Sequence, residues 1–323
     1  MNERKDNVVW IFHALTANSD PSEWWPGIVG EGKLFDPSDY LIVCVNMPGS
    51  CYGSLGPLDL AEGTGKPYFH DFPFFTTRDM IRAYKPLKEY LGIAKIHIGI
   101  GGSMGGQQLL EWAIEEPGLF EYIFPIATNA KHSSWGIAFN ASQRFAIESD
   151  ATWNTKSTHA GTEGMKVARS IALISYRHYD TYLRSQSETD DVRLSGFKSE
   201  SYQRYQGEKL AKRFNAFSYY LLSKGMDAHN VGRQRGGMAK ALSLIVAKTL
   251  VIGIETDILF PLTEQLFLTE NIADAGIVTI QSDYGHDGFL LESVQISNAI
   301  TDFTGSSKNI TKHTEIISQY GST

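Results

Sequence analysis

One short motif constrains this chain more than any other feature: a serine between glycines, where a strand pattern gives way to a helix pattern. Residues 101–105 read Gly-Gly-Ser-Met-Gly and match G-x-S-x-G. An apolar run, residues 95–100, precedes the motif, and residues 103–116 show helical spacing before Pro117. A tight strand-to-helix turn exposes the serine hydroxyl, and its crowded backbone needs small neighbours. We therefore predict that Ser103 is a nucleophile.

A glycine-rich phosphate loop is the alternative interpretation of this segment. The dinucleotide fingerprint G-x-G-x-x-G begins with Gly99 and Gly101, but Met104 stands where the third glycine is needed. The lysine of a P-loop is also absent. The segment therefore favours a nucleophile over a phosphate site.

The order of apolar segments indicates the fold. Continuous β-branched runs are typical of strands that are buried on both faces, as in a parallel sheet. Helical patterns lie between several of the runs, at residues 77–91 and 103–116. This alternation predicts a mainly parallel, doubly wound α/β fold. The six runs are residues 8–12, 40–45, 95–100, 122–126, 249–254 and 276–280.

The alternation stops between residues 129 and 247. This stretch is rich in polar and aromatic residues, shows helical patterning at 164–176 and 202–222, and has no clear strand. We predict that residues 129–247 form a helical cap over the C-terminal edge of the sheet. Residues 1–128 and 248–323 would then form the catalytic domain.

A serine hydroxyl needs a base before it can attack, so an acid and a histidine are expected. In the α/β-hydrolase order, both follow the serine. His286 is the only one of nine histidines at the end of a late strand pattern. Asp257 ends another late strand, but Glu255 points the same way by strand alternation. The pattern predicts Ser103 and His286, and it leaves the two acids open.

An oxyanion hole needs two backbone N–H groups. One should come from Met104, which follows the nucleophile, and the other from the loop after an early strand. That loop is residues 13–16, His-Ala-Leu-Thr, and we predict the Leu15 N–H.

Composition excludes several classes of protein. The net charge is −7, which argues against non-specific nucleic-acid binding. No apolar run approaches the length of a membrane span, and two cysteines suggest a reducing, cytoplasmic location. His70 and Asp71 are too few ligands for a metal site, so we predict no metal.

Several longer blocks resemble the homoserine O-acetyltransferase family, acyltransferases of the α/β-hydrolase superfamily, and most of all its Bacteroidetes members. The likeness spans residues 8–303. The matching blocks are residues 12–16, 24–27, 49–54, 56–57, 101–106, 205–207, 213–214, 257–261 and 285–290.

The resemblance implies an α/β-hydrolase fold with an inserted cap, and it selects Asp257 over Glu255 as the acid. It implies a ping-pong reaction in which Ser103 takes an acetyl group from acetyl-CoA. The L-homoserine hydroxyl then attacks the acyl-enzyme, with His286 as general base, giving O-acetyl-L-homoserine for methionine synthesis. Acetyl-CoA is a co-substrate, and no bound cofactor is implied.

The resemblance also implies that Arg169 holds the substrate carboxylate and that Asp287 holds its amino group. Arg177 and Arg213 remain alternatives for the carboxylate. A homodimer through the cap is implied, with no nucleic-acid or membrane partner. A succinyl-CoA donor, a serine acceptor or a serine esterase with the same triad remain the alternative functions.

Overall fold

The computed structural model describes residues 7–305, and within them six strands form one parallel sheet in the order β2-β1-β3-β4-β5-β6. Each of the six predicted apolar runs becomes a strand. The bounds are β1 Val8–Phe12, β2 Leu41–Cys44, β3 Ile96–Gly102, β4 Phe120–Ile126, β5 Lys248–Ile254 and β6 Ala275–Ile280.

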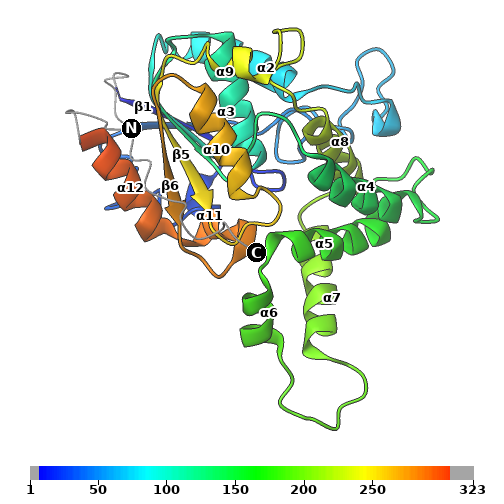
Figure 1. The fold of residues 1–323 in the computed structure, drawn as a ribbon. Helices are drawn as coiled ribbons and strands as arrows, with labels where there is room; N and C mark the ends of the chain where they lie inside the picture. Colours follow the sequence, from blue (N-terminus) through cyan, green and yellow to red (C-terminus); the bar gives the residue numbers. More distant parts are fainter. Residues whose placement is uncertain (1–6, 306–323) are drawn as a thin grey trace.

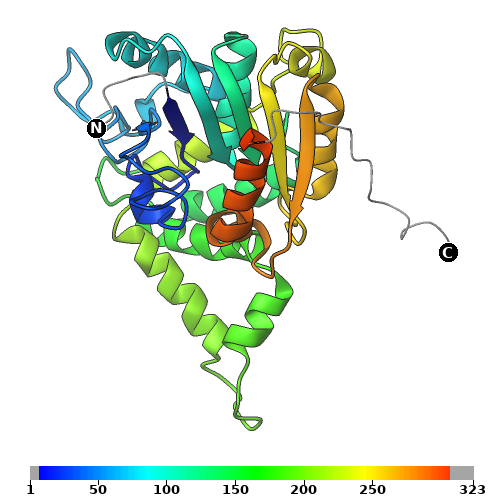
Figure 2. The ribbon, with the colours of Figure 1, turned by 90° about the vertical axis from the view of Figure 1, so that its left-hand side faces the viewer.

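Helices cover both faces of the sheet, as Figures 1 and 2 show. Alternate side chains of a strand point to opposite faces, so Trp10 and Ile11 of β1 belong to two different apolar clusters. The predicted doubly wound α/β fold is confirmed. One face carries α2 (Thr77–Tyr90), α3 (Met104–Glu115) and α10 (Leu262–Asn271), and the other carries α12 (Ser293–Gly305).

Six helices lie between β4 and β5 in the chain. Figure 1 shows α4 to α8 grouped beyond the end of the sheet to which β5 points, with α6 and α7 projecting outward. The last helix, α9, lies apart from this group and packs near α3 and α10. The bounds are α4 Ser134–Glu148, α5 Thr162–Tyr176, α6 Tyr179–Gln186, α7 Lys198–Ala211, α8 Ala216–Asp227 and α9 Met238–Leu242.

The helical pattern at residues 202–222 is not one continuous helix. It is divided between α7 and α8 by a turn in which the Asn215 side chain accepts a hydrogen bond from the Ser218 N–H at 2.8 Å. An asparagine cap of this kind begins a helix. Four short elements complete the fold: α1 Pro21–Trp24, α11 Gly288–Leu291 and the 3₁₀ turns Phe69–Asp71 and Gly285–Asp287.

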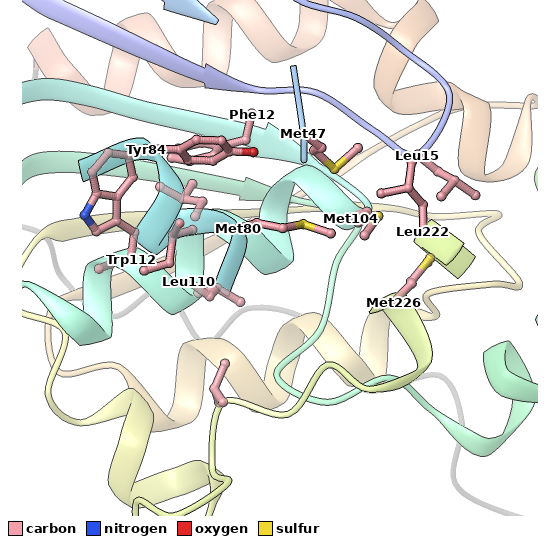
Figure 3. Close-up of a cluster of buried hydrophobic side chains, with 14 of the residues drawn as sticks. Phe12, Leu15, Met47, Met80, Tyr84, Met104, Leu110, Trp112, Leu222 and Met226 are labelled. Carbon is pink, nitrogen blue, oxygen red and sulfur yellow. The ribbon is translucent and has the colours of Figure 1, made fainter. Parts of the chain in front are cut away.

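One apolar cluster connects the sheet to the inserted helices. Its centre is aromatic, with the Trp10 and Trp112 ring centroids 4.9 Å apart in an edge-to-face arrangement. Figure 3 shows the cluster continuing to Leu15 and Met104, beside which lie Leu222 and Met226 of α8. The backbone predicted to form the oxyanion hole is therefore packed against both the sheet and the inserted segment.

Candidate active site

Ser103 occupies the turn between β3 and α3 in a backbone conformation that is rare for a residue with a side chain. Its φ is 57° and its ψ is −127°. The turn is fixed on both sides: the Ser103 N–H donates to the Ile126 carbonyl at 2.9 Å, and the Ser103 carbonyl accepts from Thr128 Oγ1 at 2.8 Å. Such a residue persists only where its surroundings determine it, as at a nucleophile.

The glycines of the motif are required by close approach of backbone to backbone. A Cβ on Gly105 would lie 2.1 Å from the Phe12 carbonyl oxygen, and one on Gly101 would lie 2.6 Å from the Gly105 carbonyl carbon. Neither neighbour is a flexible side chain that could move away. The first turn of α3 therefore packs directly on the end of β1, next to the loop of residues 13–16.

The structure brings Asp257 and His286 together in a buried pair. Asp257 Oδ2 is 2.6 Å from His286 Nδ1, and Asp257 Oδ1 accepts from the N–H groups of Leu259 and Phe260 at 2.8 and 2.9 Å. A carboxylate only accepts, so His286 Nδ1 carries the hydrogen and Nε2 is left as the basic atom. Glu255, the competing acid, is exposed.

Aromatic rings surround the His286 imidazole. The Phe260 ring stacks on it with centroids 5.1 Å apart, and the Phe289 ring lies at 5.2 Å. The same Phe289 ring touches the backbone before the nucleophile, since a Cβ on Gly102 would lie 2.4 Å from a ring carbon. One side chain thus contacts both His286 and the residue before Ser103. Ser103 and His286 form no hydrogen bond here, and such bonds are often loose before substrate binds.

The two predicted oxyanion donors lie where the sequence places them, on the loop after β1 and at the start of α3. Among the described residues, neither the Leu15 nor the Met104 N–H has a hydrogen-bond acceptor. Both amides are therefore available to a negatively charged oxygen. The N-terminus of α3 adds a favourable dipole at the same point.

His13 is a further residue of this loop, and no pattern in the sequence selected it for a catalytic role. Its Nδ1 lies 2.9 Å from the Ala14 carbonyl, so it donates there, and its Nε2 accepts from the Met47 N–H at 3.0 Å. Burial lowers the pKa of His13 to about 4. The ring is neutral at pH 7 and acts as a structural bridge.

The inserted segment carries three candidate arginines, which differ in the contacts that they already make. Arg177 Nε is 2.8 Å from Asp287 Oδ2, and only 14 % of the Asp287 side chain is exposed. Arg169 lies over the Tyr176 ring, 5.5 Å from its centroid, and none of the carboxylates in the described part of the chain pairs with it. Arg213 donates to the Thr16 carbonyl and the Tyr52 hydroxyl.

These contacts differ among the three candidate arginines for the substrate carboxylate. Arg177 and Arg213 are engaged, and Arg169 is left over an aromatic face. Burial raises the pKa of Asp287, while Arg177 and Arg169 act in the opposite direction. Arg169 and Tyr176 are seven residues apart in α5, a spacing that places them on one helix face, so Tyr176 could have been found from the sequence.

Residues 7–305 contain no group of three metal-binding side chains and no helix long and apolar enough to cross a bilayer. Both cysteines, Cys44 and Cys51, are unpaired, and burial raises the pKa of the Cys44 thiol to about 12.

Comparison with known proteins places this geometry in a family. Residues 7–293 match the sequence profile of the alpha/beta hydrolase fold. Homoserine O-acetyltransferase of Cyclobacterium marinum is 50% identical over 303 residues, which cover 94% of this chain and 86% of the relative.

Two solved structures share the architecture. Homoserine O-acetyltransferase from Staphylococcus aureus matches with a TM-score of 0.77 and 26% identity, over 95% of this chain and 88% of that chain. Esterase E22 matches with a TM-score of 0.84 and 25% identity, over 94% and 90%. The fold thus carries transferases and esterases alike, and the sequence match decides between them: the chain belongs to the homoserine O-acetyltransferase family of the α/β-hydrolase fold.

Proposed function

We propose that this protein is a homoserine O-acetyltransferase that moves an acetyl group from acetyl-CoA to L-homoserine through an acyl-enzyme on Ser103. The observation that carries the proposal is the buried Asp257–His286 pair beside the strained Ser103 turn, with an unpaired Arg169 nearby. The 50% identity to the Cyclobacterium marinum enzyme supports the choice of donor and acceptor.

In the first half-reaction, His286 Nε2 takes the Ser103 hydroxyl proton as the serine oxygen attacks the thioester carbon. The carbon–sulfur bond breaks, the proton passes to the CoA sulfur, and an acetyl ester remains on Ser103. Asp257 holds the imidazole in the required tautomer and stabilises the imidazolium that forms. The Leu15 and Met104 N–H groups would donate to the oxyanion of the tetrahedral intermediate.

In the second half-reaction, His286 takes the homoserine hydroxyl proton, and the homoserine oxygen attacks the acetyl ester. The ester bond to Ser103 breaks, and the proton returns to the serine oxygen. Homoserine carries a carboxylate and an ammonium group, which we assign to Arg169 and Asp287. The Arg177 contact leaves Asp287 Oδ1 to accept from the ammonium, while it neutralises part of the buried charge.

CoA release by the purified protein tests this proposal. Acetyl-CoA and succinyl-CoA are each supplied with L-homoserine, L-serine or no acceptor. Homoserine-dependent release with acetyl-CoA supports it, and dependence on succinyl-CoA or serine would change the donor or the acceptor. Release that ignores the acceptor, together with hydrolysis of a simple ester, would identify an esterase instead.

We propose that residues 129–247 act as a cap and that two copies of the chain pair through it. The turn between α6 and α7 exposes Val192 and Leu194 by 83% and 92%, and such exposed apolar groups mark interaction surfaces. Since α9 packs near α3 and α10, the cap proper would end with α8.

The acetyl-CoA donor and the unpaired cysteines support a cytoplasmic location.

A further inference from the structure

The loop of residues 13–16 is held by two side chains, one buried and one exposed. The first contacts the peptide that carries the Leu15 amide, and the second contacts the peptide two further along the chain. His13 contacts the carbonyl of Ala14, and Arg213 contacts the carbonyl of Thr16. His13 lies in the interior of the sheet domain, whereas Arg213 belongs to the turn between α7 and α8. The loop is therefore shared by two parts of the chain that are far apart in sequence.

The inner contact helps to fix the orientation of a catalytic donor. The Ala14 carbonyl and the Leu15 N–H belong to one planar trans peptide and point in opposite directions. That carbonyl accepts from His13 Nδ1 at 2.9 Å and from the Ala17 N–H at 3.0 Å, and together these two bonds set the plane of the peptide and the direction of its N–H. They also polarise the amide, because linked hydrogen bonds strengthen one another.

A buried glutamine links this loop to the other donor. Gln108 Nε2 donates to the His13 carbonyl at 3.4 Å and to the Met104 carbonyl at 3.2 Å. Its Oε1 accepts from the Tyr84 hydroxyl at 2.7 Å, which fixes the amide orientation. The segments that carry the two oxyanion donors are thus joined by one side chain.

The outer contact comes from the inserted helices. Arg213 Nη1 is 2.5 Å from the Thr16 carbonyl and 2.6 Å from the Tyr52 hydroxyl. Just beyond Arg213, α8 begins, and Figure 3 shows its Leu222 beside Leu15. The Arg213 guanidinium therefore binds the loop of residues 13–16 close to where α8 packs on that loop.

We propose that Arg213 and His13 are positioning residues that together hold the Leu15 amide in the oxyanion hole, so that the inserted helices complete the hole from outside. This inference rests on the proposed function, because it takes Leu15 as an oxyanion donor. It gives Arg213 a function different from binding the homoserine carboxylate. A correctly seated cap would then be a condition for acylation as well as for acceptor binding.

Arg213→Met removes the outer contact. Arg213 is exposed, so we expect the variant to fold. We expect the rate of acyl-enzyme formation to fall about ten-fold, with the KM for homoserine unchanged within two-fold. Arg213→Lys, which keeps a cation, should recover part of the rate. Arg204→Met is the matched control, since Arg204 lies on α7 in an exposed pair with Glu200 and should leave both quantities unchanged.

A second readout separates positioning from general damage. An alkyl boronic acid forms a tetrahedral anion on a catalytic serine, and its affinity should fall by the same factor as the acylation rate in Arg213→Met. His13→Leu, which removes the inner contact at similar volume, should show the same parallel loss if its thermal unfolding shows that it folds. An acetyl-CoA KM that stays unchanged would agree with an effect confined to the transition state.

Two results would overturn this inference. A higher homoserine KM with normal acylation would make Arg213 a carboxylate ligand, and unchanged kinetics would make it a surface residue. Ser103→Ala keeps the tests distinct: if that variant still turns over, the proposed function fails. If it is inactive while Arg213→Met acylates normally, only the present inference fails.

Discussion

At the level of single residues, the arginines of the candidate site differ in whether a carboxylate of the protein already pairs with them. Arg177 is paired with Asp287, whereas Arg169 lies over the Tyr176 ring and forms no ion pair within residues 7–305. An arginine without a carboxylate partner keeps its planar fork for a bidentate contact. The sequence alone could not make this distinction, because it depends on where each side chain lies in the folded chain.

Replacing this free cation should weaken acceptor binding without slowing acylation. Hydrogen bonds to charged groups contribute about 1.5–3 kcal/mol, so Arg169→Met should raise the homoserine KM roughly 10- to 150-fold. Stopped-flow measurement of the CoA burst gives acylation separately, and that rate should be unchanged. Arg184→Met, at an exposed pair with Asp283, is the control. A slower burst would contradict the assignment.

The glycine after the nucleophile should tolerate no side chain. Gly105→Ala would place a Cβ 2.1 Å from the Phe12 carbonyl oxygen, so α3 must move relative to β1. We expect a loss of about 1–3 kcal/mol in unfolding free energy, the usual cost of overpacking, together with loss of activity. Urea unfolding measures the first. Gly305→Ala, with nothing within 4 Å, is the matched control, and equal stability of the two variants would refute the steric argument.

At the level of elements, the proposed pairing of two chains can be tested at the projecting turn between α6 and α7. Leu194→Asp would place a charge in the proposed interface, and burying an unpaired charge is unfavourable. Sedimentation velocity should show a shift from dimer to monomer at micromolar concentration. Tyr90→Asp, at a comparably exposed position on α2, should leave the mass unchanged. A wild-type monomer would refute the pairing.

The elements also show what a sequence can and cannot predict. All six strands were predictable because each contains a continuous apolar run. The four inner strands are almost wholly buried, and the edge strands β2 and β6 are half-buried at most positions. The division of residues 202–222 into α7 and α8 was missed, since its signal is a single cap at Asn215 inside a helical pattern. The positions of Asp257 and His286 at strand ends were also predictable, because they follow from the positions of the strands. The functions of His13 and Arg213 were not, because both depend on contacts between distant segments.

At the level of the whole molecule, three buried histidines make folding sensitive to acid. Burial lowers the pKa of His13 to about 4 and the pKa values of His132 and His229 to about 3. Their value in an unfolded chain is about 6.5, so the unfolded chain binds more protons below that pH. The neutral rings therefore stabilise the fold above pH 6.5, and this contribution is lost as the pH falls towards 4 and then 3.

Urea unfolding between pH 7 and pH 5 checks this effect. Each histidine should contribute a slope of about 1.4 kcal/mol per pH unit once the pH is well below 6.5. His132→Gln should reduce the slope by one such increment, and His159→Gln, at an exposed position, should not change it. Buried Asp287, with a raised pKa, acts in the opposite direction near the lower limit. Identical slopes for the wild type, His132→Gln and His159→Gln would contradict the lowered pKa of His132.

The pairing of β4 with β5 has a consequence for how the chain acquires activity during folding. Tyr122 of β4 pairs with Lys248 of β5, and the entire insertion lies between them in sequence. Contacts between such distant segments form slowly, because the closure of a long loop comes first. Ser103 precedes the insertion, whereas Asp257 and His286 follow it. A nascent chain on the ribosome therefore holds the proposed nucleophile without its proposed base, and we expect it to be inactive until synthesis has passed His286.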